Sequence, residues 1–128
     1  MKTYLQRSSG IKYSDHWKTP KEIYDYFIKQ DYFDPCPIHS EINGLKINWG
    51  KKAFVNPPYS DIKLWIDKAI QQSIIGCHVV LLIPSRTDTV YFHKLLNKGI
   101  DIEFIKGRLK FGDSKTGAPF PSVLVYLR

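Results

Sequence analysis

Apolar positions along the chain fall into short continuous runs and into longer stretches with helical spacing. The short runs predict four strands, at residues 53–55, 79–83, 100–105 and 122–127. The helical spacing predicts three helices, over about residues 19–28, 61–75 and 88–97. Strand and helix alternate up to the last two strands, which predicts an α/β fold with a mostly parallel sheet and a C-terminal antiparallel strand pair.

The ends of the predicted helices carry capping signals. Thr19, Pro20 and Glu22 fit a capping box in which Thr19 is the N-cap residue. The candidate boundaries of the other two helices are Ser60 or Asp61, Asp88, Gly76 and Gly99. Residues 32–34 predict a short extended segment, whereas residues 38–50 fit a loop, a short strand or a half-turn equally well.

Polar clusters follow the predicted strands. They lie at Asp34, at residues 56–59 and at residues 85–88. In open α/β sheets, ligands bind outside the carboxyl ends of the strands. The order of residues therefore predicts a binding site at that edge of the sheet.

Length and composition favour one domain over residues 1–128, with residues 1–15 as an N-terminal arm. The 128 residues are 43% hydrophobic and 24% charged, as in an ordinary globular protein. The longest apolar run, residues 79–84, is too short to span a membrane, and residues 1–10 contain no apolar stretch of the kind found in a signal peptide. We therefore expect a soluble, cytoplasmic protein with no membrane partner and with reduced thiols at its two cysteines.

The cysteines and histidines do not form a convincing metal site. Cys36 and His39 have ligand-like spacing, and Cys77 and His78 could add two ligands. Adjacent residues of a strand point to opposite faces, however, so Cys77 and His78 could not both reach one ion. We expect no bound metal.

The charge balance favours a phosphate-bearing partner. Lys and Arg number 19 against 12 Asp and Glu, which gives a formal net charge of +7 and a pI of about 9.4. Arg108 and Lys110, close to Phe111 in a glycine-containing segment, suit contact with a nucleic-acid backbone, and a polar hairpin tip is the alternative. Arg86 fits a phosphate or base contact and a solvated surface position equally well.

The tetrapeptide at residues 56–59, Asn-Pro-Pro-Tyr, carries the most specific chemistry. Its two prolines lock φ and donate no backbone hydrogen bonds, so the Asn56 amide and a fixed carbonyl can accept the two protons of an exocyclic amino group such as N6 of adenine. Tyr59 offers a ring on which an extruded base can stack. On the tetrapeptide alone, a rigid strand-to-helix turn capped by Asn56 is an equally good interpretation.

In addition to this tetrapeptide, five other segments in order resemble the phage-type DNA N6-adenine methyltransferases, relatives of the Dam enzymes with a class I S-adenosyl-L-methionine (AdoMet)-dependent fold. The likeness runs from about residue 15 to the C-terminus and rests on residues 15–20, 33–36, 54–60, 82–89, 107–111 and 118–122. The resemblance implies a reduced Rossmann-like class I methyltransferase fold and AdoMet as cofactor.

The resemblance also implies roles for individual residues. The catalytic motif matches Asn56, Pro57, Pro58 and Tyr59. The cofactor-binding segments match Trp17, Thr19, Pro20, Asp34, Pro35 and Cys36. Apart from the resemblance, charge and position make Arg86, Arg108 and Lys110 the DNA-binding candidates. Trp17 suits cation–π contact with a sulfonium, and packing beside the first helix is its alternative role.

One departure from the family pattern concerns the space between its motifs. Only 21 residues separate Asp34 from Asn56, too few for two strand-helix units, and no glycine-rich loop follows Asp34. The adenosine half of the cofactor pocket is therefore expected to be shortened, or completed by a second copy or a partner chain.

These observations predict an adenine-specific, site-specific DNA methyltransferase that uses AdoMet and acts on duplex DNA with a flipped adenine. The alternative is a nucleic-acid-binding module of the same descent that has lost cofactor binding and catalysis. A methyltransferase acting on RNA, or on an amino group of a protein, would share the motif and differ in substrate only.

Overall fold

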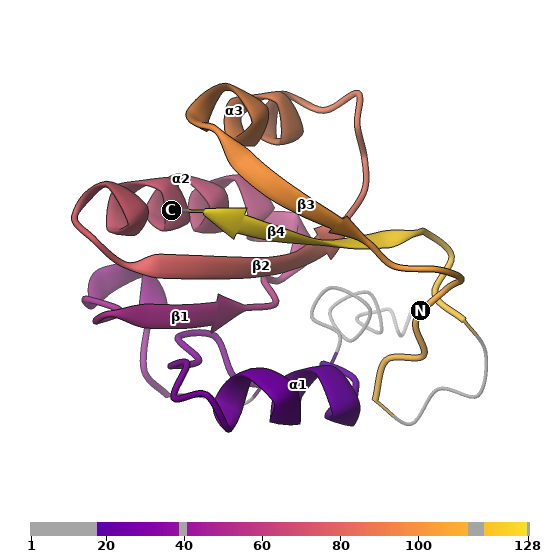
Figure 1. Ribbon diagram of the computed structural model, residues 1–128, viewed down its shortest axis with the longest axis horizontal. Helices are drawn as coiled ribbons and strands as arrows, with labels where there is room; N and C mark the ends of the chain where they lie inside the picture. The colour runs from indigo at the N-terminus through magenta and orange to yellow at the C-terminus, as the bar shows by residue number, and fades with distance from the viewer. Residues whose placement is uncertain (1–17, 39–40, 113–116, 128) are drawn as a thin grey trace, which may run out of the picture.

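The computed structural model describes residues 18–38, 41–112 and 117–127. In these residues the chain forms three α-helices, two short 3₁₀-helices and four strands, in an α/β arrangement (Figure 1). The elements are α1 (Lys21–Ile28), η2 (Gly44–Lys46), β1 (Lys52–Val55), η3 (Tyr59–Asp61), α2 (Ile62–Ile74), β2 (His78–Pro84), α3 (Val90–Lys98), β3 (Ile100–Phe104) and β4 (Ser122–Leu127). The four predicted strands and three predicted helices are thereby confirmed. None of these helices combines the length and the apolar character needed to cross a bilayer.

The described strands form one mixed sheet in the order β1-β2-β4-β3. β1 and β2 are parallel, whereas β4 is antiparallel to both of its neighbours. The predicted C-terminal antiparallel pair is therefore confirmed, and the mostly parallel sheet is not. The reason is that β4 inserts between β2 and β3, which makes two of the three ladders antiparallel.

The segment before the cysteine-containing loop adds a single bridge to the sheet rather than a full strand. Phe33 pairs in parallel with Ala53. Its N–H donates to the Lys52 carbonyl, and its carbonyl accepts from the Phe54 N–H, both at 2.9 Å. Because this bridge is parallel to β1, Asp34 leaves the sheet at the same edge as Asn56.

Helices cover the sheet on both faces (Figure 1). Alternate strand residues, such as Val79 and Leu81, pack in one cluster with α2 and α3. The intervening residues, such as Val80 and Leu82, pack on the opposite face with α1 and with part of the segment that joins β3 to β4. The apolar run of β2 is explained by this burial on both faces.

The predicted helix ends are confirmed, whereas only some of the predicted N-cap residues are. The N-cap residue of α1 is Pro20, with no side-chain capping bond, so the Thr19 capping box is wrong. Asp61 is the N-cap residue of α2, as one of the two predicted candidates, although its side chain makes no capping bond, and α3 is capped by Thr89 instead of Asp88. Thr89 lies one residue closer to the helix, where its Oγ1 accepts from the N–H of Phe92.

The segment with no clear prediction, residues 38–50, is anchored where it is described by two buried residues, Gly44 and Trp49. Trp49 is 1% exposed and donates from Nε1 to the Gly44 carbonyl at 2.8 Å. Its ring stacks with Trp65 of α2 at a centroid distance of 6.2 Å. A Cβ on Gly44 would lie 1.9 Å from the carbonyl oxygen of Pro35, so only glycine fits there.

Candidate active site

The polar clusters predicted from the sequence meet at the carboxyl edge of the sheet. Asn56 directly follows β1, and Ser85 directly follows the parallel β2. Asp34 follows the bridge between Phe33 and Ala53, on the outer side of β1. Parallel strands end at the same edge, so these three positions border one region.

Asn56 is held in one orientation by the segment that leads into α1. Its side chain is 3% exposed, and its Nδ2 donates to Thr19 Oγ1 at 3.0 Å. The Thr19 hydroxyl does not cap α1 and instead accepts from Asn56 across a separation of 37 residues. In this arrangement Nδ2 faces Thr19, and Oδ1 lies at the other corner of the planar amide group.

The two prolines connect Asn56 rigidly to the following helix. Pro57 is buried, and Pro58, at φ −66°, precedes the 3₁₀-turn η3. The Asp61 N–H donates to the Pro58 carbonyl at 3.3 Å. The turn places Tyr59 half-buried beside both core clusters.

Phe120 is a site residue to which the sequence patterns assign no role. It is 6% exposed, and its ring meets that of Tyr59 edge-on, with centroids 5.2 Å apart. The Arg86 guanidinium carbon lies 5.8 Å from the centre of the Phe120 ring, within cation–π range. The signal that marks Phe120 is its position between Pro119 and Pro121, just before a strand that the sequence predicts.

The Tyr59 hydroxyl stays protonated in this setting. Burial raises the pKa of Tyr59 far above its ordinary value, the neighbouring Tyr91 raises it further, and Arg86 acts in the opposite direction. Tyr59 is therefore a neutral aromatic surface and not a base.

Asp34 is engaged by its own loop and by α1. Its Oδ1 accepts from the Cys36 N–H at 2.9 Å. Its carboxylate also accepts from the Tyr24 hydroxyl, and burial together with this carboxylate raises the pKa of Tyr24. These contacts fix the Asp34 side chain beside α1.

The two residues that follow Asp34 pack into the protein. Pro35 is buried against Gly44, and Cys36 packs against the cluster on the α2 face. Burial, and secondarily Asp34, raises the pKa of the Cys36 thiol to about 12. The structure therefore brings Asp34, Thr19 and Pro20 to the site edge, while the side chains of Pro35 and Cys36 form its support.

The predicted DNA contacts fall in two places. Arg86 is exposed at the site edge. Arg108 and Lys110 are exposed on the segment between β3 and β4, where Arg108 Nη1 donates to the Ala118 carbonyl at 3.3 Å. Phe111 does not join them at the surface: it is 4% exposed and packs near Phe120. Trp17 lies outside the described residues.

The fold and the site define an α/β protein with an Asn-Pro-Pro-Tyr motif fixed at the carboxyl edge of a mixed sheet. The family model "DNA N-6-adenine-methyltransferase (Dam)" matches residues 8–123. The chain belongs to this family, as the sequence motifs predicted.

Two curated phage proteins support the assignment. The DNA N-6-adenine-methyltransferase of Escherichia phage T1 is 28% identical over 110 residues, which cover 74% of this chain and 46% of that protein. The DNA N-6-adenine-methyltransferase of Haemophilus phage HP1 is 28% identical over 134 aligned positions, covering 88% of this chain and 76% of that protein. The chain thus spans less than half of the T1 protein. No solved structure matches it significantly.

Proposed function

We propose that this chain transfers a methyl group from AdoMet to N6 of adenine in DNA. The observation that carries the proposal is the buried Asn56 amide, oriented by Thr19 at the carboxyl end of β1 and followed by two prolines and the Tyr59 ring. The names of the two phage relatives support the same reaction.

In the proposed reaction, Asn56 Oδ1 and the backbone carbonyl of Pro57 accept the two protons of the adenine amino group. Hydrogen bonds of this kind draw the nitrogen lone pair out of conjugation with the ring, which makes N6 a better nucleophile. Both acceptors are restrained. The amide of Asn56 is hydrogen-bonded to Thr19. The carbonyl of Pro57 is restrained because its own ring locks φ and the following Pro58 restricts ψ. The N6–CH3 bond would form as the S–CH3 bond of the donor breaks, and the proton that N6 then loses would pass through these acceptors to solvent, because Tyr59, a protonated phenol, does not take it.

The target adenine is proposed to leave the duplex and to stack on Tyr59. Extrusion is required because N6 cannot be reached by a methyl donor inside the base stack. Stacking on an aromatic ring contributes about 1–3 kcal/mol per base. Phe120, in contact with Tyr59, is proposed as the second aromatic wall of this pocket.

AdoMet would be held by the residues that gather around Asn56. Its sulfonium supplies the methyl group. Its amino acid end carries an ammonium group, which requires acceptors, and a carboxylate, which requires donors. Asp34 offers a carboxylate, and the Thr19–Pro20 segment lies within hydrogen-bond reach of Asn56 at the amino end of α1. The Asp34 carboxylate fits the ammonium group of this end of the cofactor, and the amino end of α1 fits its carboxylate. Residues 41–50 form a short loop, which is consistent with the expected shortening of the adenosine half of the pocket.

The proposed fold assignment is a reduced Rossmann-like class I methyltransferase fold. The parallel pair β1–β2, the helices on both faces and the site at the carboxyl edge support it. We propose that Arg86 contacts DNA beside the base and that Arg108 and Lys110 contact the phosphate backbone.

The test is transfer of a labelled methyl group from AdoMet to adenine-containing duplex DNA, with digestion to identify N6-methyladenosine. Asn56→Ala removes the side-chain acceptor and should lower the rate at least about 100-fold. Asn56→Asp keeps an oxygen at the same reach and should retain part of the activity. Tyr59→Phe should retain more activity than Tyr59→Ala, because the ring and not the hydroxyl stacks on the base.

Calorimetry with AdoMet separates this proposal from a nucleic-acid-binding module without catalysis. We expect the wild-type chain to bind AdoMet in the presence of DNA, and Asp34→Ala to weaken that binding. DNA binding without AdoMet binding or methyl transfer would support the binding module instead. Wild-type transfer by Asn56→Ala would reduce the tetrapeptide to a structural turn.

A further inference from the structure

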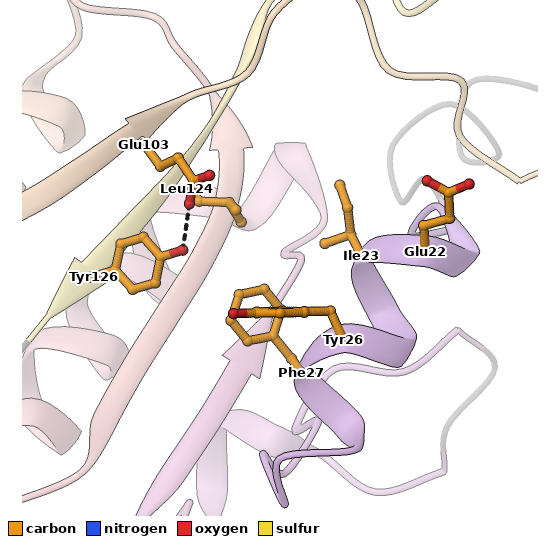
Figure 2. A pocket seen from close by; sticks show the side chains of 7 residues that line it. All are labelled: Glu22, Ile23, Tyr26, Phe27, Glu103, Leu124 and Tyr126. Atoms are coloured by element: carbon orange, nitrogen blue, oxygen red, sulfur yellow. Dashed lines mark hydrogen bonds between the residues drawn. The ribbon is translucent and has the colours of Figure 1, made fainter.

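A cavity of about 400 Å³ is lined by residues of α1, β3 and β4 (Figure 2). It is lined by Glu22, Ile23, Tyr26, Phe27, Glu103, Leu124 and Tyr126. Its volume lies within the range of small-molecule sites, about 300–1,000 Å³. None of Asn56, Pro57, Pro58 or Tyr59 lines it, so the cavity is distinct from the catalytic motif.

The charge of this cavity is opposite to that of the chain. The protein has a formal net charge of +7, yet the described lining contains two acids and no lysine, arginine or histidine. Glu103 belongs to β3, whereas Glu22 belongs to the first turn of α1 on the other wall (Figure 2). The two carboxylates therefore flank the cavity from different elements.

The surface between the two carboxylates is apolar and aromatic. Ile23 and Leu124 lie between Glu22 and Glu103 in Figure 2, and Phe27 lines the cavity below them. The Tyr126 hydroxyl donates to Glu103 Oε1 at 2.7 Å, which holds that carboxylate at the wall. Tyr26 is 62% exposed, and aromatic rings of this kind attract organic cations.

We propose that this cavity binds an aliphatic diamine, with one ammonium group at Glu103, the other at Glu22 and the methylene chain over Ile23, Phe27 and Leu124. A diamine has the same pattern as the cavity, with a charge at each end and an apolar middle. A divalent metal ion fits less well, because hard cations require about six or more oxygen ligands close together. This proposal is independent of the methyltransferase proposal.

The test is calorimetric titration of the full chain at low salt with 1,5-diaminopentane, and with 1-aminopentane as the matched monoamine. The diamine should bind at least about fivefold more tightly, because it adds a second ion pair. Glu103→Gln and Glu22→Gln should each weaken diamine binding about fivefold, while the amide oxygen introduced by Glu103→Gln can still accept from the Tyr126 hydroxyl. Glu41→Gln makes the same change at an exposed carboxylate outside the cavity and should leave the affinity unchanged.

Three results would overturn the proposal: no saturable binding of the diamine up to about 10 mM, equal affinity for diamine and monoamine, or the same loss of affinity in Glu41→Gln as in the cavity variants. Circular dichroism establishes that each variant is folded. Because Glu22 and Glu103 lie on different elements, either variant tests the site if the other does not fold. Methyl transfer is not part of the readout, so the outcome does not depend on it.

Discussion

At the scale of single residues, the contact between Thr19 and Asn56 has the largest consequence. The hydrogen bond joins the entrance of α1 to the end of β1, two places 37 residues apart. A primary amide can turn about its last side-chain bond and exchange donor for acceptor, unless one end is held. We therefore propose that Thr19 is a positioning residue for Asn56.

Replacing Thr19 with valine tests this role, because valine has nearly the same shape and no hydroxyl. We expect Thr19→Val to lower kcat for methyl transfer about tenfold, the equivalent of one hydrogen bond. Thr19→Ser restores an acceptor and should recover most of the rate. A wild-type rate in a folded Thr19→Val variant would show that the amide needs no such support.

The Cys36 thiol predicts a specific pH dependence of stability. Its pKa is about 12 in the folded protein and near 9.0 when exposed, so neither state is ionised well below pH 9. Above pH 9 the unfolded chain loses this proton first, and stability falls as pH rises. We expect the urea midpoint to fall less steeply between pH 8 and 10.5 in Cys36→Ser than in the wild type. Parallel curves would mean that Cys36 is solvated.

At the scale of elements, the loop between Phe33 and β1 depends on close packing rather than on regular hydrogen bonding. The loop is held by Trp49, which donates to the Gly44 carbonyl and stacks on Trp65 of α2. Within this loop Pro35 packs against Gly44, and Cys36 packs against the cluster on the α2 face, so the residues that follow Asp34 are held beside the candidate site.

Two glycine substitutions distinguish packing from backbone strain. In Gly44→Ala the new methyl group would lie 1.9 Å from the Pro35 carbonyl oxygen, so the loop must move, at a cost of more than about 2 kcal/mol. Gly76→Ala meets no atom within 4 Å but forces alanine to φ 107°, at a cost of about 1 kcal/mol. Urea unfolding measures both. A smaller cost at Gly44 than at Gly76 would contradict the packing described here.

The sequence predicts those elements whose burial is periodic. The apolar run of β2 and the spacing of Ile62, Trp65 and Ala69 in α2 arise from contact with the sheet, so both were found close to their true ends. Thr19 was misassigned because a hydroxyl before a proline has the same local pattern whether it caps a helix or binds a distant amide. The place of Phe120 beside Tyr59 depends on a long-range contact that no local pattern contains.

The sequence pattern overestimates the number of parallel strand pairs in the sheet, for a related reason. Apolar strands separated by helices indicate parallel neighbours, but strand order is set by tertiary packing. β4 lies between β2 and β3 and runs against both. Likewise, the contacts of Trp49 and Gly44 that anchor residues 41–50 could not be predicted, because these two residues belong to no periodic pattern.

At the scale of the whole molecule, the net charge of +7 predicts salt-sensitive binding to DNA. Arg108→Ala combined with Lys110→Ala should weaken binding about tenfold across sequences and reduce the slope of log Kd against log salt by about 2. Lys29→Ala combined with Lys51→Ala removes the same charge near the opposite edge of the sheet, where α1 ends and β1 begins, and should have a much smaller effect. Fluorescence anisotropy measures both. Equal losses would place the DNA on another surface.

The central position of β4 has a consequence for synthesis on the ribosome. A nascent chain that has emerged only as far as residue 104 contains β1, β2 and β3, but β3 has no neighbour to pair with until residues 122–127 follow. Until then one edge of the apolar β2 is unpaired, and Phe120 has not met Tyr59. The sheet and the aromatic part of the candidate site are therefore completed together, only after residues 120–127 have emerged, and premature termination after α3 would yield a chain with an open sheet edge and an incomplete site.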